Sequence, residues 1–353
     1  MKGGDVNTQT TIAKSNSVGR PNRRPGKPFV EELRRVRRPF LVGHVTPDAD
    51  CLGSVFGLAL ALKEHGAEPL VGLPADCVAK KLAFMLELAP GVQHVAGWSP
   101  EGPCDAVLVL DTAAAKRINI SPAPDFEGSL LSFNIDHHIT NTDFGRHNWV
   151  DPHASSCCEM IAVLVETLGW KTSPAVASLL YSGVYGDTSG FSLPSTSAEC
   201  LRVAADLVQA GADVAHIGEQ LCRSQGRNDF ELLRRVYDHT TVVAGGRIAY
   251  SHLSYQDISE SGCKADDIDD QVSIPRALKG VCLAMLFSEG EPGVIRINLR
   301  GEGRVTVVEL AQKFGGGGHS QSAGVKMKNK PMDSVIREVV ASAEEHLRSQ
   351  DAL

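Results

Sequence analysis

The chain has 353 residues, of which 42% are hydrophobic and 22% are charged, and its formal net charge is −7. This length permits two domains with separate cores, and the composition is that of a soluble globular protein. The acidic balance argues against a long nucleic-acid track, which normally carries a basic stripe, but leaves small anionic ligands open. The longest apolar run, residues 55–62, is too short to cross a membrane, and the N-terminus lacks the apolar core of a signal peptide. Nine cysteines without a Cys-x-x-Cys pair suit reduced thiols, so we expect a cytoplasmic protein without membrane contact.

The first part of the chain alternates between apolar strands and helices. Residues 1–27 lack apolar periodicity and are predicted to form a disordered tail. Helices are predicted over residues 29–38, from the residues after Asp50 to about 65, and over 78–89, 156–168, 174–185, 195–210 and 214–222, with a capping box formed by Ser156 and Glu159. Short apolar runs predict strands over 40–44, 68–73, 105–110 and 130–133. This alternation predicts an α/β domain with a doubly wound, mostly parallel sheet over residues 28–224.

The pattern changes in the last third of the chain. A charged segment over residues 225–240 predicts a linker helix, and residues 241–348 are predicted to form a smaller α+β domain. Residues 241–243 and 247–250 flank an Ala-Gly-Gly turn, which indicates a hairpin. Further strands are expected over 281–288 and 294–299, and helices over 307–313 and 332–348. A run of four glycines, residues 315–318, ends the first of these helices.

Polar residues gather at the carboxyl ends of the predicted strands. They are His44, Asp48 and Asp50 after the first strand, Asp111 after the third, and Asp136, His137 and His138 after the fourth, with Asp187 at the end of a helix. In an open parallel sheet these ends line the crevice where ligands bind. Several carboxylates in one crevice repel each other, and two divalent metal ions would remove the conflict. Asp and His ligands without thiolates favour Mn²⁺, with Mg²⁺, Co²⁺ and Fe²⁺ as competitors, and a two-metal site of this kind supports in-line phosphoryl displacement.

Each of these residues has an ordinary alternative role. Asp111 is compatible with a helix N-cap, Asp48 with a turn and His44 with a hydrogen-bonded core histidine. Their joint occurrence at successive strand ends favours the metal-site interpretation.

Four segments resemble the motifs of the DHH phosphoesterase superfamily. They are His44-x-x-x-Asp48-x-Asp50-x-x-Gly53-Ser54, Asp111 after a strand, Asp136-His137-His138, and Asp187-Thr188. The glycine run with His319, followed by Ser322-Ala323-Gly324, resembles the signature of the DHH-associated C-terminal domain. The resemblance covers roughly residues 30 to 345. It is strongest to the branch of oligoribonucleases and phosphatases of adenosine 3′,5′-bisphosphate (pAp).

The resemblance implies a role for each of these residues. One metal ion would be held by His44, Asp48 and Asp111, and a second by Asp50, Asp111, His137 and Asp187, with Asp111 bridging. His138 would face the scissile phosphate, and Asp136 would orient a histidine. In the second domain the implied substrate-binding residues are Asn298, Arg300, Gly316, Gly317, Gly318 and His319. Arg300 would grip a phosphate, and the glycines would let the backbone approach the nucleotide.

The implied function is a metal-dependent phosphoesterase that hydrolyses very short RNA to mononucleotides and dephosphorylates pAp. Asn298, Gly301 and Ser322 depart from the residues usual in the family, as does the Cys157-Cys158 pair, and this leaves the choice of nucleotide open. Two alternatives remain: a phosphodiesterase for linear or cyclic dinucleotide signals, and a nucleotide-sensing protein with a relic site. The sequence leaves open whether the chain forms a homodimer.

Overall fold

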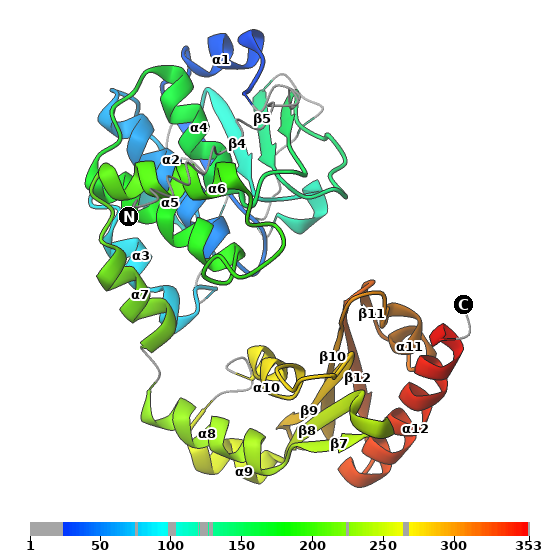
Figure 1. Cartoon of the computed structure of the whole chain (residues 1–353). Helices are drawn as coiled ribbons and strands as arrows, with labels where there is room; N and C mark the ends of the chain where they lie inside the picture. The colour runs from blue at the N-terminus through cyan, green and yellow to red at the C-terminus, as the bar shows by residue number, and fades with distance from the viewer. Residues whose placement is uncertain are drawn as a thin grey trace, which may run out of the picture. The chain divides into compact units, whose positions relative to one another are not determined.

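The chain folds into two compact units, which divide between residues 224 and 225 (Figure 1). The computed structural model describes residues 24–74, 77–97, 104–118, 120, 126, 130–223, 226–263 and 268–351. Most of the predicted N-terminal tail, residues 1–23, lies outside the described residues. Arg24, at the end of that segment, pairs with Glu166 at 3.0 Å. Within the described ranges, no helix is both long enough and apolar enough to cross a bilayer.

The first unit is built on a six-stranded sheet in which every neighbouring pair of strands is parallel. Its strands are β1 (Pro39–Val42), β2 (Leu70–Gly72), β3 (Gln93–Val95), β4 (Ala106–Leu110), β5 (Leu131–Asp136) and β6 (His147–Val150). Their order is β3-β2-β1-β4-β5-β6, so the direction of winding reverses between β1 and β4. Ligands of open α/β sheets bind at the carboxyl ends of the strands beside such a reversal.

Helices pack on one face of this sheet, and a smaller cluster of apolar side chains covers the other face. The helices are α1 (Lys27–Leu33), α2 (Ala49–Glu64), α3 (Phe84–Glu87), α4 (Cys157–Leu168), α5 (Pro174–Asp187), α6 (Ala198–Gln209) and α7 (Val214–Arg223). In Figure 1, α2, α4 and α5 lie against one another, and the three share one core. Gly53 permits this approach, because a Cβ there would lie 2.6 Å from the carbonyl oxygen of Leu179 in α5. On the other face, Val107 and Val109 of β4 pack against Ile118 and Ile120.

Several local predictions for this unit are wrong in detail. The helix expected over residues 29–38 ends at Leu33, because the N–H groups of Arg37 and Arg38 donate to Asp105 instead of continuing the helix. The helix expected over 78–89 is replaced by a 3₁₀ turn at Lys80–Leu82 and the short α3.

Only half of the predicted capping box forms at the start of α4. Ser156 accepts the N–H of Glu159 at 3.0 Å, but the Glu159 carboxylate accepts from Ser155 and not from Ser156.

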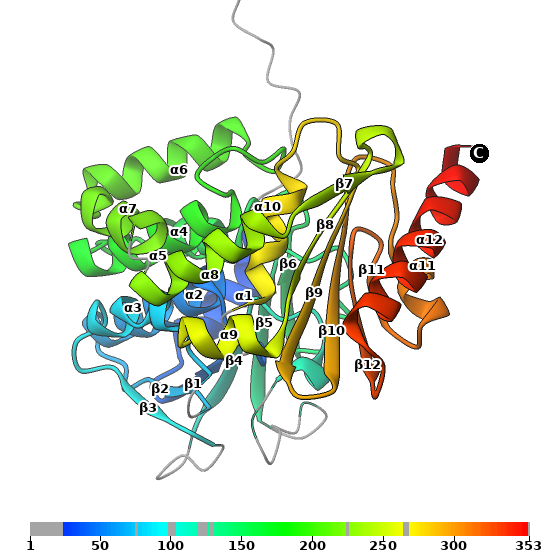
Figure 2. The same cartoon turned by 90° about the horizontal axis from the view of Figure 1, so that it is seen from below.

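The second unit contains a mixed six-stranded sheet between two layers of helices. Its elements are α8 (Arg227–Asp238), β7 (Thr241–Val243), β8 (Ile248–Leu253), α9 (Tyr255–Ser261), α10 (Ser273–Arg276), β9 (Leu283–Glu291), β10 (Val294–Gly301), α11 (Val308–Lys313), β11 (Gly317–His319), β12 (Ser322–Lys328) and α12 (Met332–Asp351). The order is β11-β12-β10-β9-β8-β7, with β8 and β9 parallel and the other neighbours antiparallel. Figure 2 shows α12 on one side of this sheet and α8, α9 and α10 on the other. The predicted fold class, a mostly parallel α/β domain joined to a smaller α+β domain, is confirmed.

Two segments of this unit have roles that the sequence analysis did not assign. The predicted linker helix corresponds to α8, which buries Leu232 and Val236 in the core of the second unit. The last two glycines of the run belong to β11, which pairs with β12.

Candidate metal centre and nucleotide-binding strands

The residues after β1 lie at the start of α2, and their positions follow from helix capping. Asp48 is the N-cap of α2, and its Oδ1 accepts the N–H groups of Asp50 and Cys51, each at 3.0 Å. The Nε2 atom of His44 lies 4.0 Å from the same Oδ1. Asp50 is in the first turn of the helix and is buried. Capping therefore fixes both aspartates of the first motif at the carboxyl end of β1.

Asp50 also touches a second helix start. Its Oδ2 accepts the N–H of Cys157 at 2.6 Å, and its Oδ1 accepts the N–H of Cys158 at 2.8 Å. A carboxylate at a helix N-terminus is stabilised by these donors and by the helix dipole. Asp50 thereby fixes the start of α4, although the two partners are 107 and 108 residues away in sequence.

Asp111 lies at the centre of the cluster. It follows β4 with a φ of 52°, and its N–H donates to the carbonyl of Ile135 on β5 at 3.0 Å. Its Oδ2 lies 3.4 Å from Nε2 of His44, and its Oδ1 lies 3.5 Å from Nε2 of His137 and 3.6 Å from Nδ1 of His138. Asp111 is thus the carboxylate that all three histidines approach.

The end of β5 and the end of α5 complete the cluster. Nε2 of His137 lies 3.8 Å from Asp50 and 3.5 Å from Asp187, the last residue of α5. His138 is held differently, because its Nδ1 lies 2.7 Å from Oδ1 of the buried Asp136. The structure therefore brings together every residue that the sequence analysis selected in the first domain.

Burial and neighbouring charges shift the pKa values of several residues in this cluster. Burial raises the pKa of Asp50 well above its usual range, and the charges of Asp111 and Asp187 raise it further. Burial also raises the pKa of Asp187 to about 6. Although burial lowers the pKa of His137, the carboxylates of Asp111, Asp50 and Asp187 raise it to about 10. The cluster thus retains protons that divalent cations would replace.

The donor set fits divalent cations. Oδ1 of Asp111 and Nδ1 of His44 are buried and have no hydrogen-bond partner. Among the described residues, candidate ligand atoms gather within 4.8 Å of one another in three groups: His44, Cys51 and Asp111; Asp111, His137 and His138; and Asp50, His137 and Asp187. Carboxylate oxygens with imidazole nitrogens suit Mn²⁺ and similar ions.

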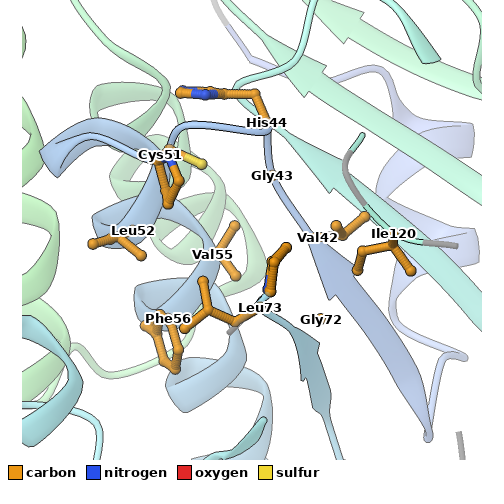
Figure 3. Close-up of a pocket in the computed structure, with 12 residues that line it drawn as sticks. Val42, Gly43, His44, Cys51, Leu52, Val55, Phe56, Gly72, Leu73 and Ile120 are labelled. Atoms are coloured by element: carbon orange, nitrogen blue, oxygen red, sulfur yellow. The ribbon is translucent and has the colours of Figure 1, made fainter. Parts of the chain in front are cut away.

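Cys51 is a neighbour that the sequence analysis did not select. Figure 3 shows its sulfur beside His44 and Gly43, where a small cavity of about 10 Å³ is lined mainly by apolar residues. A Cβ on Gly43 would collide with this sulfur. Burial raises the pKa of the Cys51 thiol well above its usual value, and a protonated thiol is a poor metal ligand. Its spacing of seven residues from His44, across a loop and a helix start, carries no local signal.

Asn141 is a second residue near the cluster that the sequence analysis did not select. Its amide nitrogen donates to Oδ2 of Asp136 at 2.6 Å and to Oδ1 of Asn134 at 2.8 Å. Asn141, Asp136 and His138 thus form a chain of hydrogen bonds that ends at the histidine. The only sequence signal for it was an amide residue shortly after the Asp-His-His triplet.

In the second unit, strand register aligns the predicted substrate-binding residues in two rows. Arg300 on β10 pairs with Ser322 on β12, and Ser322 pairs with His319 on β11. In a second row, two residues further along each strand, Asn298 pairs with Gly324, which pairs with Gly317. The sheet thus places residues 298–300 and residues 317–319 in register on either side of β12.

Two glycines of this run are needed for packing within the sheet, whereas the sequence analysis assigned the run to close approach of a nucleotide. A Cβ on Gly316 would collide with the carbonyl oxygen of Gly324. Gly318 has a φ of 148°, and a Cβ there would lie 2.6 Å from Cα of Ala323. Only Gly317 of these three has open space around it. Close packing of β11 on β12 therefore accounts for Gly316 and Gly318.

Comparison with known proteins gives matches over most of the chain. Residues 39–184 match the DHH family, N-terminal domain, and residues 245–349 match the DHHA1 domain. The chain is 32% identical to the bifunctional oligoribonuclease and PAP phosphatase NrnA of Thermus thermophilus, over 90% of this chain and 93% of that protein. It is 30% identical to the protein of the same name from Bacillus subtilis, over 86% of this chain and 94% of the relative. The fold also matches the crystal structure of an exopolyphosphatase-related protein from Bacteroides fragilis, with a TM-score of 0.79, 24% identity, and coverage of 92% and 97%.

Proposed function

This chain belongs to the DHH family, and from that premise we propose that it is a metal-dependent phosphoesterase that hydrolyses very short oligoribonucleotides to mononucleotides. We further propose that it removes the 3′-phosphate of pAp. The observation that carries the proposal is the convergence of His44, Asp111, His137 and Asp187 at the carboxyl edge of the first sheet. The names of the two relatives, which match nearly the whole length of the chain, favour short RNA and pAp as substrates.

The first unit would hold two divalent ions. In this proposal His44, Asp48 and Asp111 bind one ion, and Asp50, Asp111, His137 and Asp187 bind the other. Ions bound there would stabilise charge on the phosphoryl oxygens and make water nucleophilic near neutral pH. Oxygen and imidazole ligands favour Mn²⁺.

His138 would act on the substrate rather than on a metal. Its hydrogen bond to Asp136 raises the pKa of His138 and thereby favours the protonated ring. Asn141 holds the other oxygen of Asp136 and thereby limits rotation of the carboxylate. With Nδ1 bonded to Asp136, the Nε2–H of His138 is left to donate to a phosphoryl or leaving-group oxygen.

The second unit would bind the nucleotide. Arg300 is half-buried and lies in one register row with Ser322 and His319, and its guanidinium suits the grip of a phosphate. Asn298 and the open Gly317 share the second row. We assign substrate recognition to these two rows. Free thiols at all nine cysteines support a cytoplasmic location for this activity.

A substrate panel with Mn²⁺ tests the proposal. It compares kcat/KM for RNA from dimer to 24-mer, for pAp and for cyclic dinucleotides, at several salt concentrations. Short substrates with one to three neutralised phosphates should give a log–log salt slope of roughly −1 to −2, at about 0.7 per single-strand contact. A rate that rises with RNA length, together with a steep slope, would contradict the short-substrate assignment. Preference for a cyclic dinucleotide would support the signalling alternative, and no turnover of any substrate would support the relic-site alternative.

A further inference from the structure

A cavity of about 420 Å³ opens in the first unit beside the acidic cluster. One wall is formed by Asp48, Asp50 and Asp187. The remaining wall includes the apolar side chains Leu82 and Leu221, the ring of Tyr185, the exposed Lys81 and the exposed thiol of Cys222. This volume lies within the range of small-molecule sites, and an apolar wall with a few polar groups is typical of them. A volume of about 420 Å³ is sufficient for one nucleoside.

Tyr185 is held in place by its neighbours. Its ring lies 6.2 Å from the ring of Tyr181 at an interplanar angle of 26°, and 5.8 Å from the ring of Phe191 at 86°. Its hydroxyl lies 3.2 Å from the sulfur of Cys222. An aromatic side chain that is already fixed loses little conformational entropy when a planar ligand stacks on it.

The loop after Asp187 maintains this arrangement with a strained backbone. Ser189, Gly190 and Phe191 have φ values of 46°, 66° and 66°. These values lie in the left-handed region, which residues other than glycine rarely adopt. Two hydrogen bonds stabilise this loop conformation. The N–H of Gly190 donates to the carbonyl of Tyr185 at 2.8 Å, and the N–H of Phe191 donates to Oγ1 of Thr188 at 3.0 Å. Strained backbone of this kind persists where function requires a fixed geometry.

In this loop conformation Gly190 packs against the ring of Tyr185. A Cβ at this position would lie 3.1 Å from the Tyr185 ring, so any side chain would press on the ring. Ser189 and Gly190 also line the cavity. The strained loop thus fixes the aromatic wall next to the predicted metal ligands.

We propose that this cavity is a nucleoside subsite, in which Tyr185 stacks on the base at one side of the scissile phosphate. Base-to-aromatic stacking is tolerant of sequence, because every base has a π-face. Leu82 and Leu221 enclose the base, and Lys81 offers a cation to a phosphate on the same nucleotide. The inference rests on the proposed function and deepens it, because part of the substrate grip then belongs to the first unit.

The kinetic test removes either the tyrosine or the base. Tyr185→Leu is compared with Tyr255→Leu, which changes an exposed tyrosine of the second unit that does not line the cavity. The substrates are the dinucleotide pApA and two analogues that lack the base at the first or the second nucleoside. The wild type should prefer the intact dinucleotide over one analogue by roughly tenfold to a hundredfold, and Tyr185→Leu should abolish that preference. Equal losses on all three substrates, or the same loss in Tyr255→Leu, would overturn the subsite.

A binding test needs no turnover. Cys222 is the exposed cysteine among the nine, so its alkylation by N-ethylmaleimide can be followed by mass spectrometry. Saturating AMP should slow this alkylation at least fivefold, ribose 5-phosphate should slow it much less, and Tyr185→Leu should remove the difference. Each rate is compared with and without ligand in the same variant, because the substitution also removes the Tyr185 contact of the thiol.

The two tests separate the two hypotheses. Tyr185-dependent protection by AMP in a chain that hydrolyses no phosphodiester would contradict the proposed function alone. Normal hydrolysis of short RNA, without base discrimination or protection that depends on Tyr185, would overturn the subsite alone.

Discussion

Replacement of Asp111 by Asn should abolish activity while the fold is kept. Among the described residues its side chain accepts no backbone N–H, and the rings of His44, His137 and His138 approach it to 3.4 to 3.6 Å. Two unit charges at 3.5 Å interact by about 5 kcal/mol at an effective dielectric constant of about 20. Loss of one group that stabilises charge in a transition state costs about 3–4 kcal/mol, and this carboxylate is expected to serve two ions. We therefore expect turnover to fall at least a thousandfold on every substrate.

The assay measures turnover of a dinucleotide at saturating Mn²⁺, and metal content after gel filtration. Asp105→Asn is the matched control, because Asp105 precedes β4 whereas Asp111 follows it. Asp105 accepts the N–H groups of Arg37 and Arg38, so its loss should lower the free energy of unfolding without releasing metal. If Asp111→Asn retains a tenth of wild-type turnover, or binds two ions as the wild type does, the shared-carboxylate assignment is wrong.

Two further predictions concern the substrate grip and pH. Arg300→Ala should leave Mn²⁺ binding intact and lower kcat/KM for nucleotides at least tenfold, while a small activated phosphodiester is hydrolysed nearly as before; equal losses on both would show that Arg300 is not a separate nucleotide grip. Because the pKa of His137 is about 10 in the metal-free chain, a bound cation must displace its proton, and Mn²⁺ affinity should rise at least tenfold per pH unit between pH 7 and 8.5. The pKa of Asp187 is raised only to about 6, so its proton is already lost in this range, and a flat affinity in a Mn²⁺ titration would refute the assignment of His137 as a ligand.

The metal-site residues could be selected from sequence because their signal is local. His44, Asp111 and Asp136 each follow or end a short apolar run, and the ends of parallel strands meet at one edge of the sheet. The partners of these residues could not be found in this way. The bonds from the N–H groups of Cys157 and Cys158 to Asp50 depend on the packing of α4 against α2, which no local pattern encodes.

Two of the strands that escaped prediction are β3 and the seven-residue β12. Strand β3 has only three residues, and two of them, Gln93 and His94, are exposed, so no apolar alternation marks it. The alignment of His319 with Ser322, and so with the row of Arg300, depends on β11, whose glycines resemble a flexible loop in the sequence. Such pairing is set by close backbone approach, for which composition gives only a weak sign.

Asp50 accepts two backbone hydrogen bonds from the start of α4, so the acidic residues of the cluster differ in how well they tolerate substitution. A substitution at Asp50 leaves the first N–H groups of α4 without their acceptor in a buried place, and the cost falls on the folded state whether or not metal is present. Changes at Asp111 or Asp187 remove charge from a crowded site and spare these bonds. A copy of this gene released from selection for catalysis should therefore lose Asp111 or Asp187 early and keep Asp50 long afterwards. An aspartate that survives alone at this position in a relative is evidence of a stable fold rather than of an active enzyme.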